Sequence, residues 1–345
     1  MSFKFRKSLL KTRRFIFFAA IFLILTSPTQ SFAECAAQKA ETVWIEQTLR
    51  IWGKTRQDAL LLPAEKLPWL VLFDESCVWH VNPDLPTLKL AANSRIPFNR
   101  KLADVYLTSH DGKITLPNKQ EIPAQLLSFA SNYDGGKKPF FVSAMPSVWQ
   151  KAPNLKAEKS LDALVKSVFM HEMTHTLHQS FYARLDALEK QMSEVKNFDD
   201  DIIQNTFSEK ENFRTAFEKE HALLYRAVDE PNLSRKRKLA RTALDLIKSR
   251  RSRFFVEKDA VYLELEEIFL TMEGAANWAA YKSAMAQGLS KTDALKLIRR
   301  SGKYWSQEEG LALFLLIDAL LPKWQKKAFG KSSATVTDLL SEAVR

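Results

Sequence analysis

His171, Glu172 and His175 belong to the string H-E-M-T-H at residues 171–175, whose residue types and spacing could bind a metal ion and catalyse hydrolysis. Residues four apart lie on one face of a helix, so the two imidazoles can approach one ion. Zinc binds imidazole nitrogen, and a catalytic zinc site keeps one position open for water. Glu172, beside that water, could accept its proton and return it to a leaving group. The string therefore predicts a hydrolytic zinc site.

This string must be placed on a helix to work. Ser160 is a plausible N-cap, and the apolar residues after it recur at spacings of three and four, which predicts a helix over about 160–196. The alternative is a core helix whose histidines are merely hydrogen-bonded. That alternative leaves Glu172 between two partly buried histidines without a purpose.

A catalytic zinc ion needs a third protein ligand. His178 lies seven residues after His171, which is about 10.5 Å along a straight helix and too far for a shared ion. A carboxylate from the helix predicted over 259–287 is the remaining option. Glu273 is favoured, because small residues follow it at 274–276 and would let this helix approach the motif helix closely.

Asn277 lies four residues after Glu273 on the same predicted face, where its amide oxygen could bind the outer nitrogen of a ligand histidine. Other third ligands stay open. They are Glu266, Glu267, His221 and the aspartates Asp199, Asp200 and Asp201.

The elements around these residues predict an α+β fold. A small mixed region of helix and antiparallel sheet over 34–155 is expected to pack on a larger, mainly helical region over 156–345, with zinc in the cleft between them. Expected strands lie at 68–73, 77–81, 104–108, 113–116 (a hairpin with the preceding one) and 140–144. Expected helices lie at 36–60, 160–196, 207–228, 233–256, 259–287, 306–321 and 334–344.

Residues 171–175 and 273–277 together resemble the gluzincin branch of the zinc metallopeptidases. In that branch an H-E-x-x-H helix is completed by a Glu from a later helix, often within Glu-x-x-x-Asp, and here Asn277 replaces the Asp. The resemblance implies a zincin-like catalytic region and one Zn²⁺ per chain bound by His171, His175 and Glu273. The chain departs from the family pattern in the long helical insertion that we expect over 181–258.

The resemblance also implies roles for neighbouring residues. An edge strand before the motif helix pairs with an extended peptide substrate in such enzymes, and the segment Phe141-Val142-Ser143-Ala144 is in the expected place. A donor to the oxyanion is needed as well. No histidine follows residue 221, so Tyr281 and Tyr304 are the candidates.

The N-terminus has the pattern of a signal peptide over residues 1–33. Six basic residues precede an apolar run over 15–25, which is shorter than the roughly 20 residues needed to span a bilayer. Ser31 and Ala33 place small residues at a cleavage site before Glu34. The chain is therefore expected to be exported, periplasmic or secreted, without a stable membrane span after cleavage; an uncleaved anchor is the alternative.

The charge of the chain does not point to nucleic acid. Of the net charge of +11, six units come from the leader, and no nucleic-acid fold motif accompanies the rest. Basic clusters at 235–238 and 250–253 are interpreted as solvated helix faces. The expected partner is a peptide or protein substrate.

The mature chain carries two cysteines, Cys35 and Cys77. Disulfides persist in exported proteins, so one bridge from the new N-terminus to the first strands is a reasonable expectation. Neither cysteine lies near the H-E-M-T-H string, which disfavours a cysteine ligand.

Hydrolysis of peptide bonds by an exported zinc metallopeptidase is the function these residues favour. Two other functions remain open: a zinc hydrolase of a non-peptide amide or ester, and a non-catalytic binding protein that retains the zincin fold. Strand pairing at the cleft would favour the peptidase, and metal content separates both enzymes from the binding protein.

Overall fold

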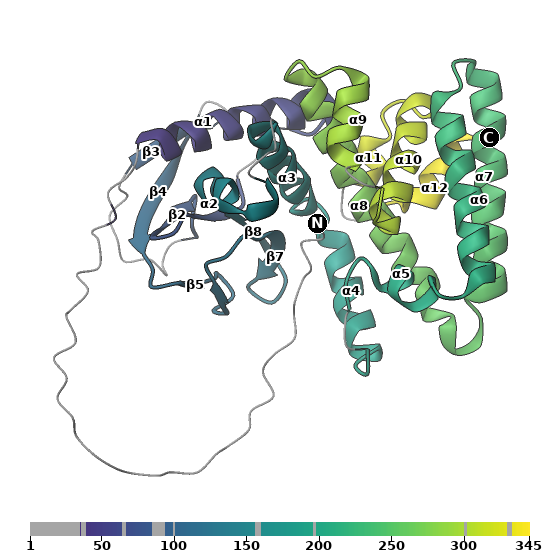
Figure 1. Cartoon of the computed structure of the whole chain (residues 1–345), viewed down its shortest axis with the longest axis horizontal. Helices are drawn as coiled ribbons and strands as arrows, with labels where there is room; N and C mark the ends of the chain where they lie inside the picture. The colour runs from purple at the N-terminus through teal and green to yellow at the C-terminus, as the bar shows by residue number, and fades with distance from the viewer. Residues whose placement is uncertain are drawn as a thin grey trace, which may run out of the picture.

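A six-stranded sheet and a group of helices make up the two sides of the molecule (Figure 1). The structure is a computed structural model that describes residues 35, 39–63, 67–84, 94–98, 101–155, 160–195, 198–299, 302–329 and 333–345. The predicted signal peptide over 1–33 lies outside these residues. The predicted α+β layout is confirmed. Within the described residues, no helix combines the length and apolar character that crossing a membrane requires.

The large sheet has the strand order β3-β4-β2-β1-β8-β7. Its strands are β1 (Trp69–Phe73), β2 (Cys77–Val81), β3 (Ser94–Phe98), β4 (Lys101–Ser109), β7 (Ser128–Tyr133) and β8 (Lys138–Ala144). Neighbouring strands are antiparallel except β1 and β8, which are parallel, so the sheet is mixed, whereas an antiparallel one was expected. Strand β1 is buried at every residue, which explains its uninterrupted apolar sequence.

The predicted hairpin between 104–108 and 113–116 is wrong. Strand β5 (Lys113–Thr115) pairs with β6 (Glu121–Pro123) in a separate two-stranded sheet. Strand β4 already pairs with β2 on one side and β3 on the other, so neither side is left for β5. Gly112, with φ of +96°, makes the turn that leads the chain away from the large sheet.

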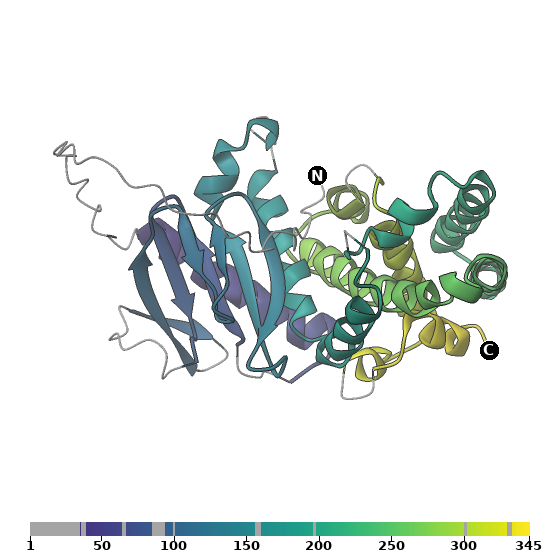
Figure 2. The same ribbon diagram turned by 90° about the horizontal axis from the view of Figure 1, so that it is seen from below.

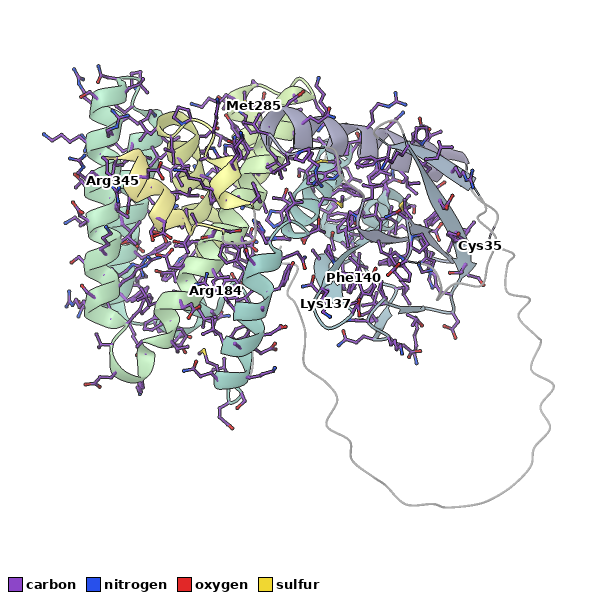
Figure 3. All side chains as sticks on the ribbon, turned by 180° about the vertical axis from the view of Figure 1, so that it is seen from behind. Cys35, Lys137, Phe140, Arg184, Met285 and Arg345 are labelled. Carbon is purple, nitrogen blue, oxygen red and sulfur yellow. A yellow bond between two sulfur atoms is a disulfide. The ribbon has the colours of Figure 1, made fainter. Side chains whose placement is uncertain are left out.

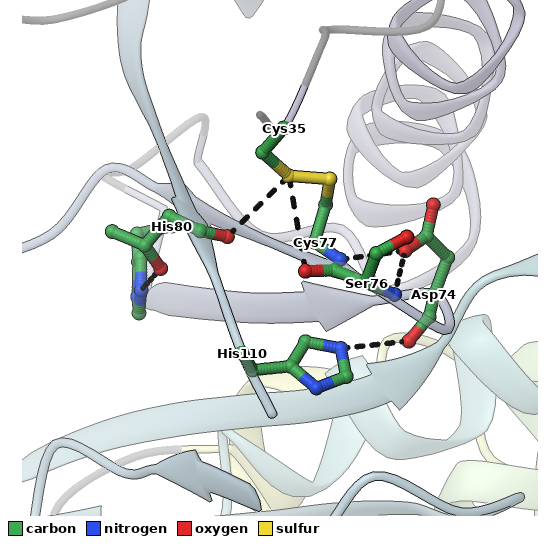
Figure 4. Close-up of a disulfide and its surroundings, with 7 residues drawn as sticks. Cys35, Asp74, Ser76, Cys77, His80 and His110 are labelled. Atoms are coloured by element: carbon green, nitrogen blue, oxygen red, sulfur yellow. Dashed lines mark hydrogen bonds between the residues drawn. A yellow bond between two sulfur atoms is a disulfide. The ribbon is translucent and has the colours of Figure 1, made fainter. Parts of the chain in front are cut away.

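A disulfide joins Cys35 to Cys77 at the start of β2 (Figure 4). The two Cα atoms are 5.7 Å apart, within the usual range for a bridge. The turn before Cys77 is held by Asp74, whose Oδ1 accepts hydrogen bonds from the backbone N–H groups of Ser76 (2.8 Å) and Cys77 (2.7 Å). The bridge therefore ties the segment before the first helix to the β1–β2 turn.

Most helices follow the sheet in sequence. They are α1 (Lys39–Lys54), α2 (Pro146–Lys151), α3 (Leu161–His175), α4 (Gln179–Gln191), α5 (Ile202–Phe207), α6 (Glu211–Asp229), α7 (Leu233–Phe254), α8 (Val261–Ala286), α9 (Lys291–Arg299), α10 (Trp305–Leu320), α11 (Gln325–Ala328) and α12 (Val336–Ala343). Helix α1 crosses one face of the sheet, and α8 lies among the helices beyond the sheet (Figure 2). The short helices α5 and α9 were not expected from the sequence.

Helix α3 packs into two apolar clusters at once. The largest core contains Phe169 of α3 together with Phe141 of β8 and Trp278 of α8, so it continues across residue 155 from the sheet into the helices. Val168 of α3 instead joins Val142 in the cluster on the other side of the sheet. Because both clusters contact α3, its rotation is fixed, and the histidines on its remaining face point in a defined direction.

The motif helix is shorter than the predicted span of 160–196, because α3 ends at His175. The hydroxyl of Thr174 donates to the Met170 carbonyl (2.8 Å), and that of Thr176 donates to the Met173 carbonyl (2.6 Å). Such side-chain bonds offer the backbone an alternative to the helical ladder. After this break the chain continues as α4, a separate helix that begins at Gln179 (Figure 1).

Gly274 lies against helix α10 and not against the motif helix as expected. A Cβ atom at this position would lie 2.5 Å from the carbonyl oxygen of Gly310, so the two backbones cross too closely for a side chain. Gly274→Ala is therefore expected to destabilise the fold by about 1–3 kcal/mol through overpacking. Chemical unfolding measures this change. Leu263→Ala, at a solvent-exposed position of the same helix, is the control, and equal stability of Gly274→Ala and wild type would contradict the close crossing.

Candidate metal centre

Three side chains from two helices converge at one point. His171 and His175 come from α3, and Glu273 comes from α8, which packs against α3. The two Nε2 atoms are 3.0 Å apart, and the Glu273 carboxylate lies 3.3 Å from Nε2 of His171 and 3.2 Å from Nε2 of His175. Among the described residues, this is the single group of three or more such side chains able to share a metal ion.

The spacing of these ligand atoms fits a tetrahedral ion. Ligands about 2.0–2.1 Å from one ion in tetrahedral geometry lie about 3.3 Å from one another. The two Nε2 atoms are 3.0 Å apart; Oε2 of Glu273 lies 3.3 Å from Nε2 of His171, and Oε1 of Glu273 lies 3.2 Å from Nε2 of His175. The two imidazole nitrogens and the carboxylate oxygen that faces each of them are therefore close to the separation that ligands of one small divalent metal ion require.

Asn277 fixes the protonation of the first ligand. Its Nδ2 donates to the Gln307 carbonyl (3.3 Å), so its Oδ1 is the atom 2.9 Å from Nδ1 of His171. An amide oxygen can only accept, so Nδ1 of His171 carries the proton and Nε2 presents its lone pair to the centre. The structure therefore contains the expected hydrogen bond between the amide oxygen of Asn277 and the outer nitrogen of a histidine in the centre.

We expect Asn277→Ala to lower metal affinity by about 10–100-fold, because the imidazole of His171 loses the partner that orients it. Asn277→Asp keeps an acceptor at this position and is expected to retain most of the affinity. Competition with a metal-binding dye measures both variants. Unchanged affinity of Asn277→Ala would show that this hydrogen bond does not tune the centre.

Glu273 is suited to be an ionised ligand. Burial alone raises the pKa of this carboxyl, but the neighbouring side chains of His175 and His171 outweigh burial and lower the pKa well below its usual value. Near neutral pH the group is therefore a carboxylate. A deprotonated oxygen is the form that binds a metal ion.

The other glutamates proposed as the third ligand, and His221, have partners elsewhere. Glu266 accepts hydrogen bonds from the buried side chains of Arg250 (2.7 Å) and Arg251 (2.5 Å), and Glu267 also pairs with Arg251. Nε2 of His221 lies 3.8 Å from the carboxylate of Glu308 on α10. The interpretation of 250–253 as a solvated face is wrong for both arginines, which neutralise buried carboxylates.

His178 is outside the centre, as the spacing indicated. It follows the end of α3, is buried, and its ring stacks on Phe329 with centroids 5.4 Å apart. Burial lowers the pKa of this imidazole, so the ring is neutral. Among the described residues neither ring nitrogen has a hydrogen-bond partner. His178 therefore serves as a packing residue beneath the turn that follows His175.

A cavity of about 360 Å³ opens onto the three ligands. Residues of α3 and α8 form its floor. Glu172, which lies between the two histidines in the sequence, is one of these residues. Residues of α4 and the following segment 198–200 form one wall, and β7 forms the other. Asp200 receives a hydrogen bond from Gln307 (3.3 Å); burial, followed by the charge of Glu273, raises the pKa of the Asp200 carboxyl.

The assignment of Phe141-Val142-Ser143-Ala144 to an edge strand is wrong. These residues belong to β8, which lies inside the sheet between β1 and β7. The edge strand beside the centre is β7, with Ser128, Ala130 and Asn132 among the lining residues. β7 was not recognised from the sequence, because its polar run Ser-Phe-Ala-Ser-Asn-Tyr lacks the apolar pattern typical of a buried strand.

Tyr281 and Tyr304 were expected to donate to the oxyanion. Neither lines the described part of the cavity, so this assignment is wrong. Tyr281 is buried in the core, and Tyr304 caps the start of α10. Tyr182 of α4 lines the cavity instead. Burial raises the pKa of its hydroxyl far above the usual value, and the negative charges of Glu172 and Glu273 add to the effect. The hydroxyl therefore stays protonated and can donate a hydrogen bond.

Fold and site together define an α+β chain with two histidines and one glutamate that could hold a metal ion, placed in a cavity beside an edge strand. No protein-family model, curated protein or solved structure matches the chain. Its function is therefore inferred from the chemistry of these residues.

Proposed function

We propose that this protein is an exported zinc-dependent metallopeptidase. The observation that carries the proposal is the convergence of His171, His175 and Glu273 in a cavity that also contains Glu172 and is bordered by the edge strand β7. Any one of these features also occurs in proteins without catalytic activity. Their combination supplies metal ligands, a carboxylate base and a backbone that can pair with a peptide.

Zinc is the metal that this donor set favours. Two imidazoles with one carboxylate is a common set of protein ligands at catalytic zinc sites, and the fourth position of such sites is left for water. When bound, zinc lowers the pKa of that water and polarises the carbonyl of the scissile bond. The residues of the chain would supply the remaining requirements: a base, an oxyanion donor and a means of positioning the substrate.

Glu172 is proposed to carry the proton from water to the leaving group. It lies next to His171 on α3 and lines the same cavity. Its carboxylate would accept a proton from the attacking water and donate it to the amine that leaves. The new C–O bond would form first and leave the negative charge on the former carbonyl oxygen; the peptide C–N bond would then break, and the proton from water would end on the leaving nitrogen.

The edge strand supports a peptide as substrate. β7 pairs with β8 on one side, and on its other side no described strand pairs with it. An extended peptide can add to such an edge through main-chain hydrogen bonds, which bind the backbone whatever its side chains. A hydrolase of a small amide or ester would gain little from a strand in this position.

Tyr182 is proposed to steady the oxyanion, because its protonated hydroxyl lines the cavity near Glu172 and Glu273. Tyr182→Phe is expected to lower kcat by about 10²–10³-fold with little change in KM, since the bond strengthens only as charge develops. Steady-state kinetics on a fluorogenic peptide measures the effect. Tyr281→Phe, in the core, is the control; equal kcat for Tyr182→Phe and wild type would remove this role.

The cysteine bridge supports the proposed export. Disulfides persist mainly in oxidising compartments outside the cytosol, and Cys35 lies just after the predicted cleavage site before Glu34. N-terminal sequencing of the protein recovered from cell fractions tests this part. A mature chain that begins at Glu34 is expected, and an intact leader in the membrane fraction would favour the anchored alternative.

Metal analysis with a peptide digest tests the proposed function as a whole. The purified mature protein is expected to contain about one zinc per chain and to cleave an unstructured peptide library. A chelator should abolish cleavage, and added zinc should restore it. A metal-free protein without hydrolytic activity would support the non-catalytic binding protein; zinc with activity only on esters would support the other hydrolase.

A further inference from the structure

One face of α4 forms the cavity wall opposite β7. Tyr182, Leu185, Asp186 and Glu189 all line the cavity, and their spacing of three, four and seven residues is that of one helical face. The face therefore presents an oxyanion donor near the metal ligands and two carboxylates farther along the helix. The mechanism proposed above uses the tyrosine and leaves the two carboxylates without a role.

The charge of the cavity is opposite to that of the chain. The chain has 51 Lys and Arg against 40 Asp and Glu. Among the described residues that line the cavity, no Lys or Arg is present, whereas six are acidic: Glu172, Asp186, Glu189, Asp199, Asp200 and Glu273. Glu172 and Glu273 have roles at the metal centre, and the other four acidic groups lie on the wall formed by α4 and the segment after it.

The carboxylates on α4 are not neutralised by their neighbours. Neither Asp186 nor Glu189 has an ion-pair partner among the described residues. The basic residue between Tyr182 and Asp186, Arg184, pairs instead with Glu264 at 2.9 Å and is not part of the lining. Figure 3 labels Arg184 on α4 and, on the sheet side, Lys137 in the turn before β8. The wall thus remains available to a cation from a ligand.

The opposite wall carries no charge. β7 contributes Ser128, Ala130, Ser131 and Asn132 to the cavity lining. A peptide added to β7 directs alternate side chains to opposite sides of its strand, so one set can approach α4. A cavity lined by one sign of charge concentrates the field and attracts ligands of the opposite sign.

We infer that this cavity selects peptides with Lys or Arg side chains close to the scissile bond, through Asp186 and Glu189 of α4. The inference rests on the proposed function, because it assumes a peptide on β7. Backbone pairing provides general affinity, and the acidic wall provides the preference for a cationic side chain. An acidic side chain at the same place meets like charge and is rejected.

Peptide binding to a zinc-loaded Glu172→Gln variant tests the inference without hydrolysis. Three fluorescent peptides that differ only at one position, Lys, Gln or Glu, are compared by anisotropy. The Lys peptide is expected to bind about tenfold more tightly than the Gln peptide, and the Glu peptide most weakly. The preference for Lys should shrink as salt is raised, because screening weakens interactions between partly exposed charges.

Charge-neutral variants locate the preference. Added to the same background, Asp186→Asn with Glu189→Gln should lower affinity for the Lys peptide about tenfold and for the Gln peptide by less than about twofold. Glu194→Gln, a solvent-exposed site outside the lining, is the matched control and should leave the Lys preference intact. About one zinc per chain in every variant shows that the metal centre is unchanged.

The outcomes separate this inference from the proposed function. Equal affinity for the three peptides, or no binding of any, overturns the inference, even if the wild-type protein cleaves peptides. A Lys preference that survives neutralisation of Asp186 and Glu189 also overturns it. A Lys preference abolished by these variants, with no cleavage by the zinc-loaded wild type, would sustain the inference and sink the peptidase.

Discussion

Glu172→Gln is expected to keep its zinc and to lose peptide hydrolysis by about 10²–10⁴-fold, the usual contribution of a general base. Glu172 lines the cavity but is not one of the three converging side chains, so its amide variant leaves the ligand set complete. The amide cannot accept the proton of the attacking water. Single-turnover cleavage of a fluorogenic peptide measures the loss of hydrolysis, and zinc analysis of the same sample measures the retained metal.

Asp162→Asn is the matched control for this variant. Asp162 lies in the first turn of the same helix, where it pairs with Lys166 (2.6 Å) and is outside the cavity lining. Its loss should leave turnover nearly unchanged. Wild-type turnover by Glu172→Gln would end the proposed mechanism, whereas loss of zinc from this variant would move Glu172 into the ligand set.

Glu273→Gln is expected to have the largest effect on metal binding. It removes the anionic ligand between His171 and His175 while preserving side-chain volume. The loss should exceed the roughly 10–100-fold expected for removal of an outer partner such as Asn277, because a direct ligand is removed. Zinc content after dialysis and affinity by dye competition measure the change, and hydrolysis should fall with zinc occupancy.

A control on the same helix separates the loss of a ligand from a general effect on α8. Glu264 is solvent-exposed and pairs with Arg184, so Glu264→Gln should keep about one zinc per chain. Equal zinc affinity of Glu273→Gln and wild type would mean that the third ligand lies elsewhere. Glu273→Asp gives a further check, because the shorter side chain should weaken binding less than the amide does.

Local pattern was sufficient for the first part of the site. His171, Glu172 and His175 lie within one helix, where spacing along the chain fixes which residues share a face. The choice of Glu273 and Asn277 needed the helical face of a second segment and the resemblance to gluzincins. The structure brings both residues to the α3 histidines. Gly274, however, permits the close crossing with α10 and not with α3.

The cavity walls could not be assigned from sequence. The apolar run in β8 indicates burial on both faces, which is typical of a strand inside a sheet. The polar strand β7 forms the edge of the sheet beside it. Tyr182 lines the cavity from a separate helix, α4, because α3 ends at His175 and does not continue to residue 196 as expected. Tyr281 and Tyr304 lie outside the cavity, because the packing of segments distant in the sequence decides the surroundings of each side chain.

Local patterns along the chain were enough to predict the α+β layout and the helix that carries H-E-M-T-H, with its two histidines on one face and a carboxylate between them in the sequence. These features are local, because neighbouring residues in one segment specify them. Strand order, the acidic wall of α4 and the close crossing of Gly274 with α10 emerged only in the folded chain. Sheet edges and cavities form between segments far apart in the chain, through packing that no single segment encodes.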